Sequence, residues 1–299
     1  MMKRKQLNKP YNKPHKKWKK RNLNRSFSGD VTLFLVLFLM GLVMVLPIVL
    51  AVSNALKPLD ELFVFPPRFI VRHPTLENFV DVFRIMSDSW IPFSRYIFNT
   101  VSITVLGTGG HLIIASMCAY ALSKHKFPGR NIIFAIITTA LMFSGQVTAI
   151  PNYLIISKIG WIDSHVAIII PALAKPLGLF LMKQFMEQIP DTLLEAARID
   201  GASEIHTFFR IAMPQVKSAW LTLIIFSFQD LWNAQGSNYI YSEELKTLPY
   251  ALSQIAAGGI ARAGATAAVT VIMMIVPIAI FIISQSNIIE TMASSGIKE

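Results

Sequence analysis

Long runs of apolar residues, separated by shorter polar segments, dominate the hydropathy pattern of this chain. Six of these runs are long enough to cross a bilayer core of roughly 30 Å as helices. They cover residues 31–53, 98–122, 131–156, 165–186, 217–240 and 266–287. The pattern predicts an all-α membrane protein with six transmembrane helices, in which a membrane domain at 31–287 follows a basic tail at 1–30 and precedes a short tail at 288–299.

The distribution of positive charge predicts the orientation of these helices. The first thirty residues hold eleven Lys or Arg against one acidic residue, Asp30. If this tail is inside, nineteen Lys or Arg lie on the inner side and eight on the outer side. By the positive-inside rule, both termini and the polar segment 191–214 are expected in the cytoplasm. A nucleic-acid arm is the alternative for the tail, but we favour a topology anchor that meets membrane lipid, with no nucleic-acid partner.

The candidate chemical motifs argue against an enzyme. Residues 259–266 have the glycine spacing of a phosphate-binding loop, but Ala265 stands where that loop needs a lysine. The six histidines are scattered and show no metal-ligand spacing. No nucleophile, base and orienting acid can be grouped from the sequence. We therefore expect a non-catalytic chain with no metal and no cofactor of its own.

The polar segment between the fourth and fifth runs carries the most specific motif. Its small, turn-forming and boundary positions have fixed spacing and are Glu195, Ala196, Ala197, Asp200, Gly201, Ala202, Ile211 and Pro214. The two alanines allow a partner helix to approach closely, and Gly201 can take the positive φ that ends one short helix before another begins. Pro214 lacks a backbone donor and suits the break before the next span.

Two charged side chains fall inside predicted spans. Lys175 lies about 18 Å from the outer end of the fourth run, and Asp230 lies roughly 20 Å from the inner end of the fifth. Because the two spans are antiparallel, the charges are expected at similar depths. A charge inside the membrane is costly and marks a functional site by default. The alternative is that the two residues pair only to satisfy each other.

Polar side chains and one aromatic ring cluster around Asp230. Hydroxyl-rich sugars hydrogen-bond to polar groups and pack their CH faces on aromatic rings. The candidate residues of a sugar path are Asn233, Asp230, Gln229, Trp232 and Lys175. Asp230 and Asn233 share a helix face, so we rank them above Trp232. Interhelical hydrogen bonding, with Trp232 in an interfacial aromatic belt, is the alternative.

The segment 191–214 resembles the signature loop of permease subunits of ATP-binding-cassette importers. Shorter matches between residues 54 and 299 resemble the carbohydrate subgroup, most of all the smaller permease of maltose-type importers. These matches include Lys57-Pro58, Phe127-Pro128-Gly129-Arg130, Ile150-Pro151, Ile189-Pro190 and Trp232-Asn233. The region around Trp232 departs from the Phe-Leu-Trp-Pro run of that subgroup, and Met213 stands in the usual place of Leu.

This resemblance implies a multi-pass permease subunit of the bacterial inner membrane that forms half of a pathway for a sugar or oligosaccharide. The implied partners are a second homologous permease, two ATPase subunits that hold ATP and Mg, and an extracytoplasmic sugar-binding protein. The resemblance also implies that Glu195 forms a salt bridge with an ATPase arginine. Gly296, Ile297 and Lys298 would then reach into the ATPase dimer.

Two other interpretations remain open. One is an importer of the same kind for glycerol phosphate, a polyamine or an amino acid. A phosphate cargo would favour arginines facing the pore, and the spans offer only Lys175. The other is a secondary transporter, for which inverted repeats and coupling-ion carboxylates are expected. The sequence shows no repeat, and this interpretation leaves the 191–214 motif unexplained.

Overall fold

The computed structural model describes residues 27–66, 68–87 and 90–295, with the backbone alone for residues 27 and 286–295. All regular secondary structure in these ranges is helical. The chain divides into two compact units, Met1–Ile48 and Val49–Glu299. The predicted contact residues Gly296, Ile297 and Lys298 and most of the basic tail lie outside the described residues. The sites discussed below belong to the second unit.

The described residues form a succession of helices and helical turns. In order they are α1 (Phe27–Leu56), α2 (Leu59–Leu62), α3 (Glu77–Ser87), α4 (Phe93–Lys124), α5 (Arg130–Ala140), α6 (Gly145–Ile159), α7 (Val166–Leu173), α8 (Pro176–Met186), α9 (Asp191–Ile199), α10 (Glu204–His206), the π-helical η1 (Thr207–Ala212), α11 (Met213–Gln215), α12 (Lys217–Trp232), the 3-10 turn η2 (Glu243–Leu245), α13 (Leu248–Ala256), the 3-10 turn η3 (Ile260–Arg262) and α14 (Ala263–Ser295).

Four helical stretches of the described chain are long and apolar enough to cross a membrane. They are Ser28–Leu56, Phe93–Lys124, Val166–Met186 and Ile260–Gln285. The predicted spans 31–53, 98–122, 165–186 and 266–287 correspond to these stretches. The described residues therefore have between four and six candidate spans, depending on how two bent pairs of helices are counted.

The predicted run 131–156 is not one straight span, because α5 and α6 bend by 110°. Thr138 and Thr139 lie in the last turn of α5, and their hydroxyls donate to the carbonyl of Ala135 at 2.9 and 2.8 Å. Hydroxyl bonds of this kind compete with the helical ladder and favour bends. The backbone then closes tight turns through Phe143 before α6 begins. An apolar run gives its length but not the path of its backbone.

The predicted run 217–240 is also shorter as a helix than expected. α12 ends at Trp232, and residues 233–240 are non-helical. The helical residues Glu204–Gln215 and α12 pass as a span only as a pair bent by 85°. Non-helical backbone is tolerated at membrane depth only where it finds other partners. Here the Thr247 hydroxyl donates to the carbonyls of Ala234 and Gln235 at 2.9 and 3.1 Å, and the amide of Asp163 donates to the carbonyl of Tyr239 at 2.7 Å.

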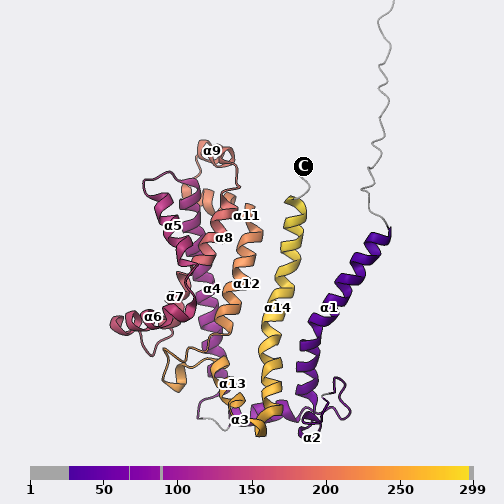
Figure 1. The fold of residues 1–299 in the computed structure, drawn as a ribbon. Coiled ribbons are helices and arrows are strands. Elements are labelled where there is room, and N and C mark those ends of the chain that lie inside the picture. Colours follow the sequence, from indigo (N-terminus) through magenta and orange to yellow (C-terminus); the bar gives the residue numbers. More distant parts are fainter. Residues whose placement is uncertain (1–26, 67, 88–89, 296–299) are drawn as a thin grey trace, which may run out of the picture. The chain divides into compact units, whose positions relative to one another are not determined.

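α4 forms the centre of the second unit. It packs against α7, α8, α12 and α13, while α12 also packs against α14. Figure 1 shows α4, α8 and α12 running side by side. The close approach depends on small residues: a Cβ added at Gly178 of α8 would lie 2.8 Å from Leu223 Cδ1 of α12 and would overlap the ring of His111 in α4. Glycine at helix crossings lets membrane helices pack closely.

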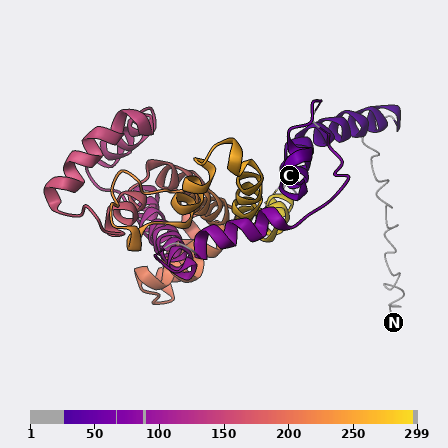
Figure 2. The same ribbon diagram turned by 90° about the horizontal axis from the view of Figure 1, so that it is seen from below.

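The second unit has different helices at its two ends. α9 and the C-terminal end of α14 lie at one end, and α2, α3 and α13 lie at the other (Figure 1). Seen from below, α5 and α6 lie beside the cluster of α4, α8 and α12 rather than within it (Figure 2). α6 carries large exposed apolar side chains, among them Val147, Ile150 and Leu154.

Candidate functional site

The segment 191–214, whose motif residues we predict to dock on an ATPase subunit and which we call the docking segment, forms a helix, a turn and a second helix. α9 ends at a turn in which Gly201 has φ 84°. The amide of Gly201 donates to the carbonyl of Arg198, and the amide of Ala202 donates to the carbonyl of Ala197, both at 3.0 Å. This pair of bonds is the Schellman motif, which places a positive-φ glycine after the helix end. The turn therefore depends on a residue at 201 that tolerates positive φ.

The second helix restarts immediately after this turn. The Ser203 hydroxyl accepts a hydrogen bond from the amide of His206 at 3.3 Å, which caps the new helix. α10, η1 and α11 then run continuously to Val216, where the chain bends into α12. The indole of Trp220 in α12 donates to the carbonyl of Met213 at 3.2 Å, so a side chain fixes this bend.

One face of the docking segment is built into the helical core. Leu194, Ala197 and Phe208 are buried from the segment's side. Leu194 and Phe208 pack in one cluster with Tyr120 of α4, Met182 and Met186 of α8, and Leu223 of α12. The ring of Phe208 meets that of Tyr120 edge-on at 5.3 Å. The segment is thus packed directly on the three central helices.

Polar contacts add to this anchoring. The Lys124 ammonium, at the end of α4, forms an ion pair with Asp191 at 2.8 Å and donates to the carbonyl of Ile189 at 2.5 Å. The hydrogen bond from Lys124 lowers the pKa of Asp191 below its usual value. Arg198 pairs with Glu204 at 2.8 Å across the turn. The Tyr120 hydroxyl donates to the same carboxylate at 3.4 Å.

The opposite face of the segment is exposed. Of the predicted docking residues, Glu195, Ala196, Asp200, Gly201 and Pro214 are exposed, Ala202 and Ile211 are half-buried, and Ala197 is buried. Large apolar side chains that the sequence analysis did not single out share this exposure. Ile199 is 86% exposed and Ile205 is 72% exposed. Exposed large apolar side chains with a rim of polar residues mark candidate protein interfaces.

Lys175 and Asp230 form an ion pair at 2.8 Å. Lys175 lies in the break between α7 and α8, and Asp230 lies near the end of α12. Their side chains are 41% and 60% exposed, so the pair is not sealed within the helices of this unit. The two charges meet because the spans are antiparallel, in accord with their expected depths.

His111 supports this site from α4 and was not identified from the sequence. Its Nδ1 lies 2.6 Å from the Ser227 hydroxyl, and its Nε2 lies 3.2 Å from the carbonyl of Lys175. A break in a helix leaves carbonyls without an intrahelical donor, and a buried side chain can supply one. The imidazole therefore connects α4, α8 and α12 at the depth of the ion pair.

The other candidates for the sugar path separate into two groups. Asn233 is exposed, and its side chain donates to the carbonyl of Gln229 at 2.8 Å. Trp232 is 6% exposed, and its indole donates to the carbonyl of Met273 in α14 at 3.3 Å. Residues two apart on a helix point to nearly opposite sides. Trp232 therefore faces α14, whereas Asp230 faces Lys175.

Comparison with known proteins adds to this geometry. Residues 111–293 match the family of binding-protein-dependent transport system inner membrane components. The chain belongs to this family. Members are inner membrane parts of transport systems that also use a separate binding protein, and this permease is accordingly a multi-pass protein of the inner membrane. The membership argues against the secondary-transporter interpretation.

Three relatives show the range of likeness. "Protein LplC" of Bacillus subtilis is 36% identical over 171 residues, 57% of this chain and 54% of its own length. The arabinooligosaccharides transport system permease protein AraQ of Halalkalibacterium halodurans is 29% identical over 236 residues. These residues cover 75% of this chain and 80% of AraQ. The sn-glycerol-3-phosphate transport system permease protein UgpE of Yersinia enterocolitica is 32% identical over 178 residues. These residues cover 58% of this chain and 63% of UgpE. The match thus spans about half of LplC.

A solved structure shares the fold. A chain of a bacterial ABC transporter involved in the import of the acidic polysaccharide alginate superposes with a TM-score of 0.73 at 23% sequence identity. The superposition covers 88% of this chain and 98% of the other. The helical arrangement is therefore that of an ABC transporter permease.

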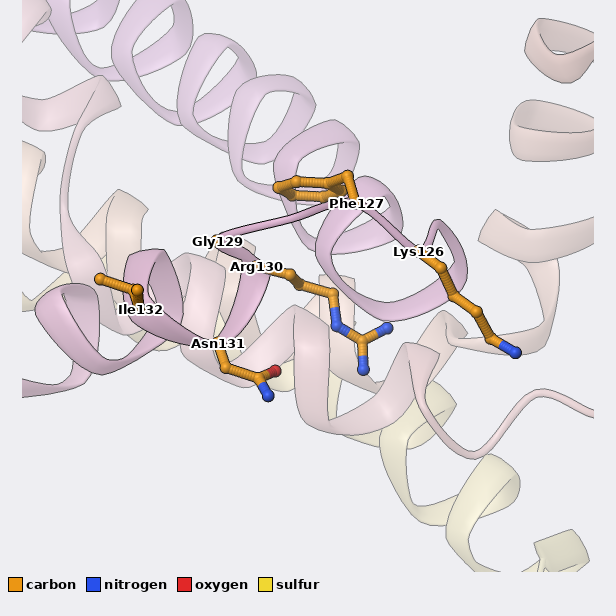
Figure 3. Close-up of a pocket in the computed structure, with 6 residues that line it drawn as sticks. All are labelled: Lys126, Phe127, Gly129, Arg130, Asn131 and Ile132. Carbon is orange, nitrogen blue, oxygen red and sulfur yellow. The ribbon is translucent and has the colours of Figure 1, made fainter.

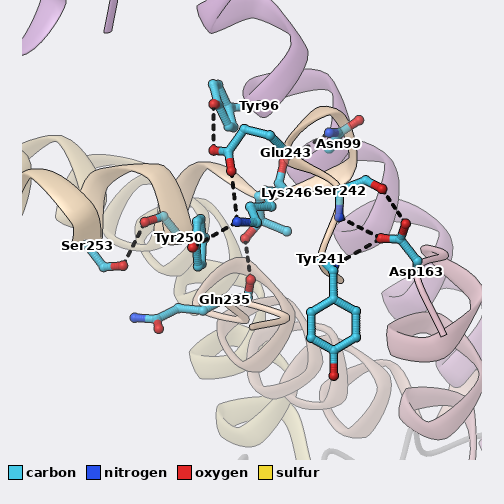
Figure 4. A network of polar contacts seen from close by, with 11 residues as sticks. Tyr96, Asn99, Asp163, Gln235, Tyr241, Ser242, Glu243, Lys246, Tyr250 and Ser253 are labelled. Carbon is cyan, nitrogen blue, oxygen red and sulfur yellow. Dashed lines mark hydrogen bonds and ion pairs between the residues drawn. The ribbon is translucent and has the colours of Figure 1, made fainter. Parts of the chain in front are cut away.

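The segment 233–247 of this permease is held by side chains from distant elements (Figure 4). The Asp163 carboxylate accepts from the amides of Tyr241 and Ser242 at 2.9 and 2.8 Å. Hydrogen bonds from the Ser242 hydroxyl and amide lower the pKa of Asp163. The Asn99 amide nitrogen donates to the carbonyls of Glu244 and Lys246 at 2.8 and 2.9 Å. These bonds satisfy a backbone that has no helical ladder of its own.

One tyrosine of α6 and two of this segment gather together, and the sequence analysis did not identify them. Tyr153 of α6 stacks on Tyr239 with ring centroids 6.4 Å apart, and its hydroxyl lies 3.3 Å from that of Tyr241. Tyr153 and Tyr241 line an open cavity of about 350 Å³ together with Asn238. Exposed aromatic faces beside hydroxyls and an amide suit a sugar ring.

Proposed function

We propose that this permease forms half of the translocation pathway of an ATP-driven importer for a sugar or oligosaccharide. The observation that carries the proposal is the docking segment 191–214, which is exposed on one face and packed into α4, α8 and α12 on the other. In this arrangement α9 and α10 lie in the cytoplasm and contact an ATPase subunit. The chain itself is non-catalytic, and ATP and Mg bind to the ATPase partners.

The proposed coupling is mechanical. When the two ATPase subunits close on ATP, they displace α9 through Glu195 and the exposed apolar side chains. Leu194 and Phe208 transmit this displacement to the central helices because they lie in one buried cluster with Tyr120 and Met182. Well-packed cores move as bodies rather than deform. The motion shifts the equilibrium between inward-facing and outward-facing states of the pathway that this chain forms with a second, homologous permease.

A neutral cargo fits the polar surface of the proposed path. The charge of Lys175 is matched by Asp230 at 2.8 Å, which leaves no net charge at that depth. Asp230 and Asn233 offer oxygen and amide groups for sugar hydroxyls, and the tyrosine cavity offers aromatic faces. The likeness to a relative named for arabinooligosaccharide transport supports the same class, which an extracytoplasmic sugar-binding protein would deliver.

Glycerol phosphate is the second candidate cargo, since a relative is named for its transport. A phosphate group favours unpaired arginine or lysine side chains. Lys175 is already paired, and this argues against a phosphate at that depth. The proposal therefore ranks sugars above phosphate esters.

Uptake into cells that express the intact importer tests this order. A strain lacking the chain, complemented with the wild-type gene, should regain uptake of labelled neutral oligosaccharides and not of labelled glycerol phosphate. Restored uptake of glycerol phosphate alone would overturn the sugar assignment and leave the importer assignment standing. Uptake of both classes at unchanged rates in the absence of ATPase subunits would overturn the importer itself.

A further inference from the structure

A cavity of about 400 Å³ opens where α4 gives way to α5, in the loop beside the docking segment, where His125 lies 3.8 Å from Glu204. Its lining residues come from one short loop and the first turn of a helix, and they are Lys126, Phe127, Gly129, Arg130, Asn131 and Ile132. Figure 3 shows that the Lys126 ammonium, the Arg130 guanidinium and the Asn131 amide extend to the same side of this loop. The cavity therefore gathers hydrogen-bond donors.

The two cations of this cavity lie outside the close ion pairs of the described part of the chain, although the charge of Lys126 helps to lower the pKa of Asp191. Neither Lys126 nor Arg130 forms an ion pair there, and Arg130 makes one weak bond, to the carbonyl of His125 at 3.5 Å. Asp191 pairs instead with Lys124 at 2.8 Å. The amide of Arg130 donates to the carbonyl of Phe127 at 3.4 Å. The amides of Asn131 and Ile132 add donors, since a helix start leaves its first amides without intrahelical acceptors. Two unpaired cations and these amides favour an anion.

The same cavity has an apolar rim. The side chain of Phe127 is 37% exposed and that of Ile132 is 67% exposed. The loop joins the candidate span Phe93–Lys124 to the helix Arg130–Ala140 of the first bent pair, so it lies where hydrocarbon meets headgroups. A free anion would need the cations alone. A ligand with an anionic head and an apolar tail uses both parts.

We propose that this cavity binds the phosphate group of an anionic phospholipid. Arg130 holds two phosphate oxygens through its planar guanidinium, and Lys126 adds a point charge. Phe127 and Ile132 contact the first part of an acyl chain. Basic pockets beside cytoplasmic membrane helices recognise headgroups in this manner. The inference concerns the lipid around the permease and is independent of the imported cargo.

Native mass spectrometry of the purified full-length chain measures this binding. The chain is titrated with phosphatidylglycerol and, in parallel, with phosphatidylcholine. The variant K126Q/R130Q should bind phosphatidylglycerol about 30-fold more weakly than the wild type, on the basis of about 1 kcal/mol per cation near a membrane surface. Phosphatidylcholine binding should stay the same. Unchanged binding of phosphatidylglycerol would overturn the proposal.

Two further variants separate the cavity from general charge and from misfolding. K158Q/R210Q also removes two positive charges but none from the cavity, and it should keep the wild-type affinity. K126R/R130K keeps the charges and should retain most of the binding even if K126Q/R130Q proves unstable. Equal losses in K158Q/R210Q and K126Q/R130Q would contradict a built site.

Competition distinguishes the sources of the phosphate. Millimolar inorganic phosphate or glycerol phosphate should displace phosphatidylglycerol only weakly, because neither ligand reaches the apolar rim. Full displacement by inorganic phosphate would assign the cavity to a free anion and overturn the lipid. If K126Q/R130Q keeps its lipid affinity but loses co-purification with ATPase subunits, the cavity belongs to a protein interface.

Discussion

At Gly178 the absence of a side chain brings three helices together. α8 crosses α4 there so closely that an added Cβ would overlap the imidazole of His111 and lie 2.8 Å from Leu223 Cδ1. The imidazole is itself held between Ser227 and the carbonyl of Lys175. It has little freedom to move aside without giving up a hydrogen bond.

We therefore expect Gly178→Ala to destabilise the protein by about 1–3 kcal/mol, the usual cost of overpacking a tight core. Thermal unfolding of the purified permease in detergent measures the change. Gly109→Ala on α4 is the matched control, because a Cβ there meets no described atom within 4 Å. Equal stability of Gly178→Ala and the parent would show that the crossing can relax.

The ion pair of Lys175 and Asp230 has two possible roles that single variants do not separate. If the pair only satisfies its own charges, removing both charges should restore transport lost on removing one. If Asp230 contacts the sugar, K175M/D230N stays impaired. We expect the second result, with the concentration of sugar for half-maximal uptake raised about tenfold or more, as for loss of a hydrogen bond to a charged group.

Variants of two residues near Asp230 test independently whether this region lines the sugar path. Asn233→Ala should raise the half-maximal sugar concentration without changing assembly, since Asn233 is exposed and makes one local bond. Trp232→Phe should change stability more than affinity, because the indole faces α14. Parent-like uptake by both D230N and Asn233→Ala would remove these residues from the path.

Among the elements, the docking segment joins an exposed face to a buried one. Its turn is closed by the Schellman bonds around Gly201, and its two helices are tied by the pair of Arg198 and Glu204. The coupling role assigned to it requires both the turn and the exposed carboxylate of Glu195. Each can be changed without touching a membrane span.

We expect Gly201→Pro and Glu195→Lys to abolish sugar uptake while the protein still inserts in the membrane. Proline cannot take the φ of 84° found at position 201, and the lysine reverses a charge meant for an ATPase arginine. Co-purification of ATPase subunits and transport are measured together. Lys217→Gln, a charge change just beyond the segment, is the control, and coupled transport by Glu195→Lys would count against the assigned role.

The tyrosine cluster is an element-scale site, since it joins α6 to the segment 233–247. Tyr153→Phe and Tyr241→Phe keep the rings and remove the hydroxyls, whereas alanine removes the stacking surface. If a sugar packs there, alanine at Tyr153 or Tyr241 should weaken uptake more than phenylalanine does. Assembly with the other importer subunits should stay the same. Lys158→Ala, on the same helix, serves as control. Equal effects of alanine and phenylalanine would favour an interfacial belt.

At the scale of the whole molecule, we predict that orientation in the membrane depends on the positive charges of residues 1–25. Deleting residues 1–25 removes eleven positive charges, so insertion or orientation should weaken while substrate preference stays the same. A cysteine at Asp60 in a Cys118→Ser background reports which side of the membrane is labelled by an impermeant thiol reagent. Normal labelling, with loss of bound nucleic acid, would instead favour the arm that we discounted.

The sequence by itself determined which segments are apolar enough to enter a membrane and where one specific turn must lie. The free energy of moving an apolar run from water into hydrocarbon depends only on the side chains of that run, so it is a local property. The lengths of the apolar runs therefore located the spans in α1, α4, α7 with α8, and α14. The glycine at 201 likewise carries its own conformational preference. Both inferences needed no knowledge of distant residues.

Only the tertiary structure decided which side chains meet. The bend after α5, the partnership of Lys175 with Asp230 and the support from His111 depend on helices that are far apart in the chain. The orientation of Trp232 toward α14 rests on a carbonyl 41 residues away. The physical reason is that side-chain direction follows from packing between segments, and packing is not encoded in the composition of any one run.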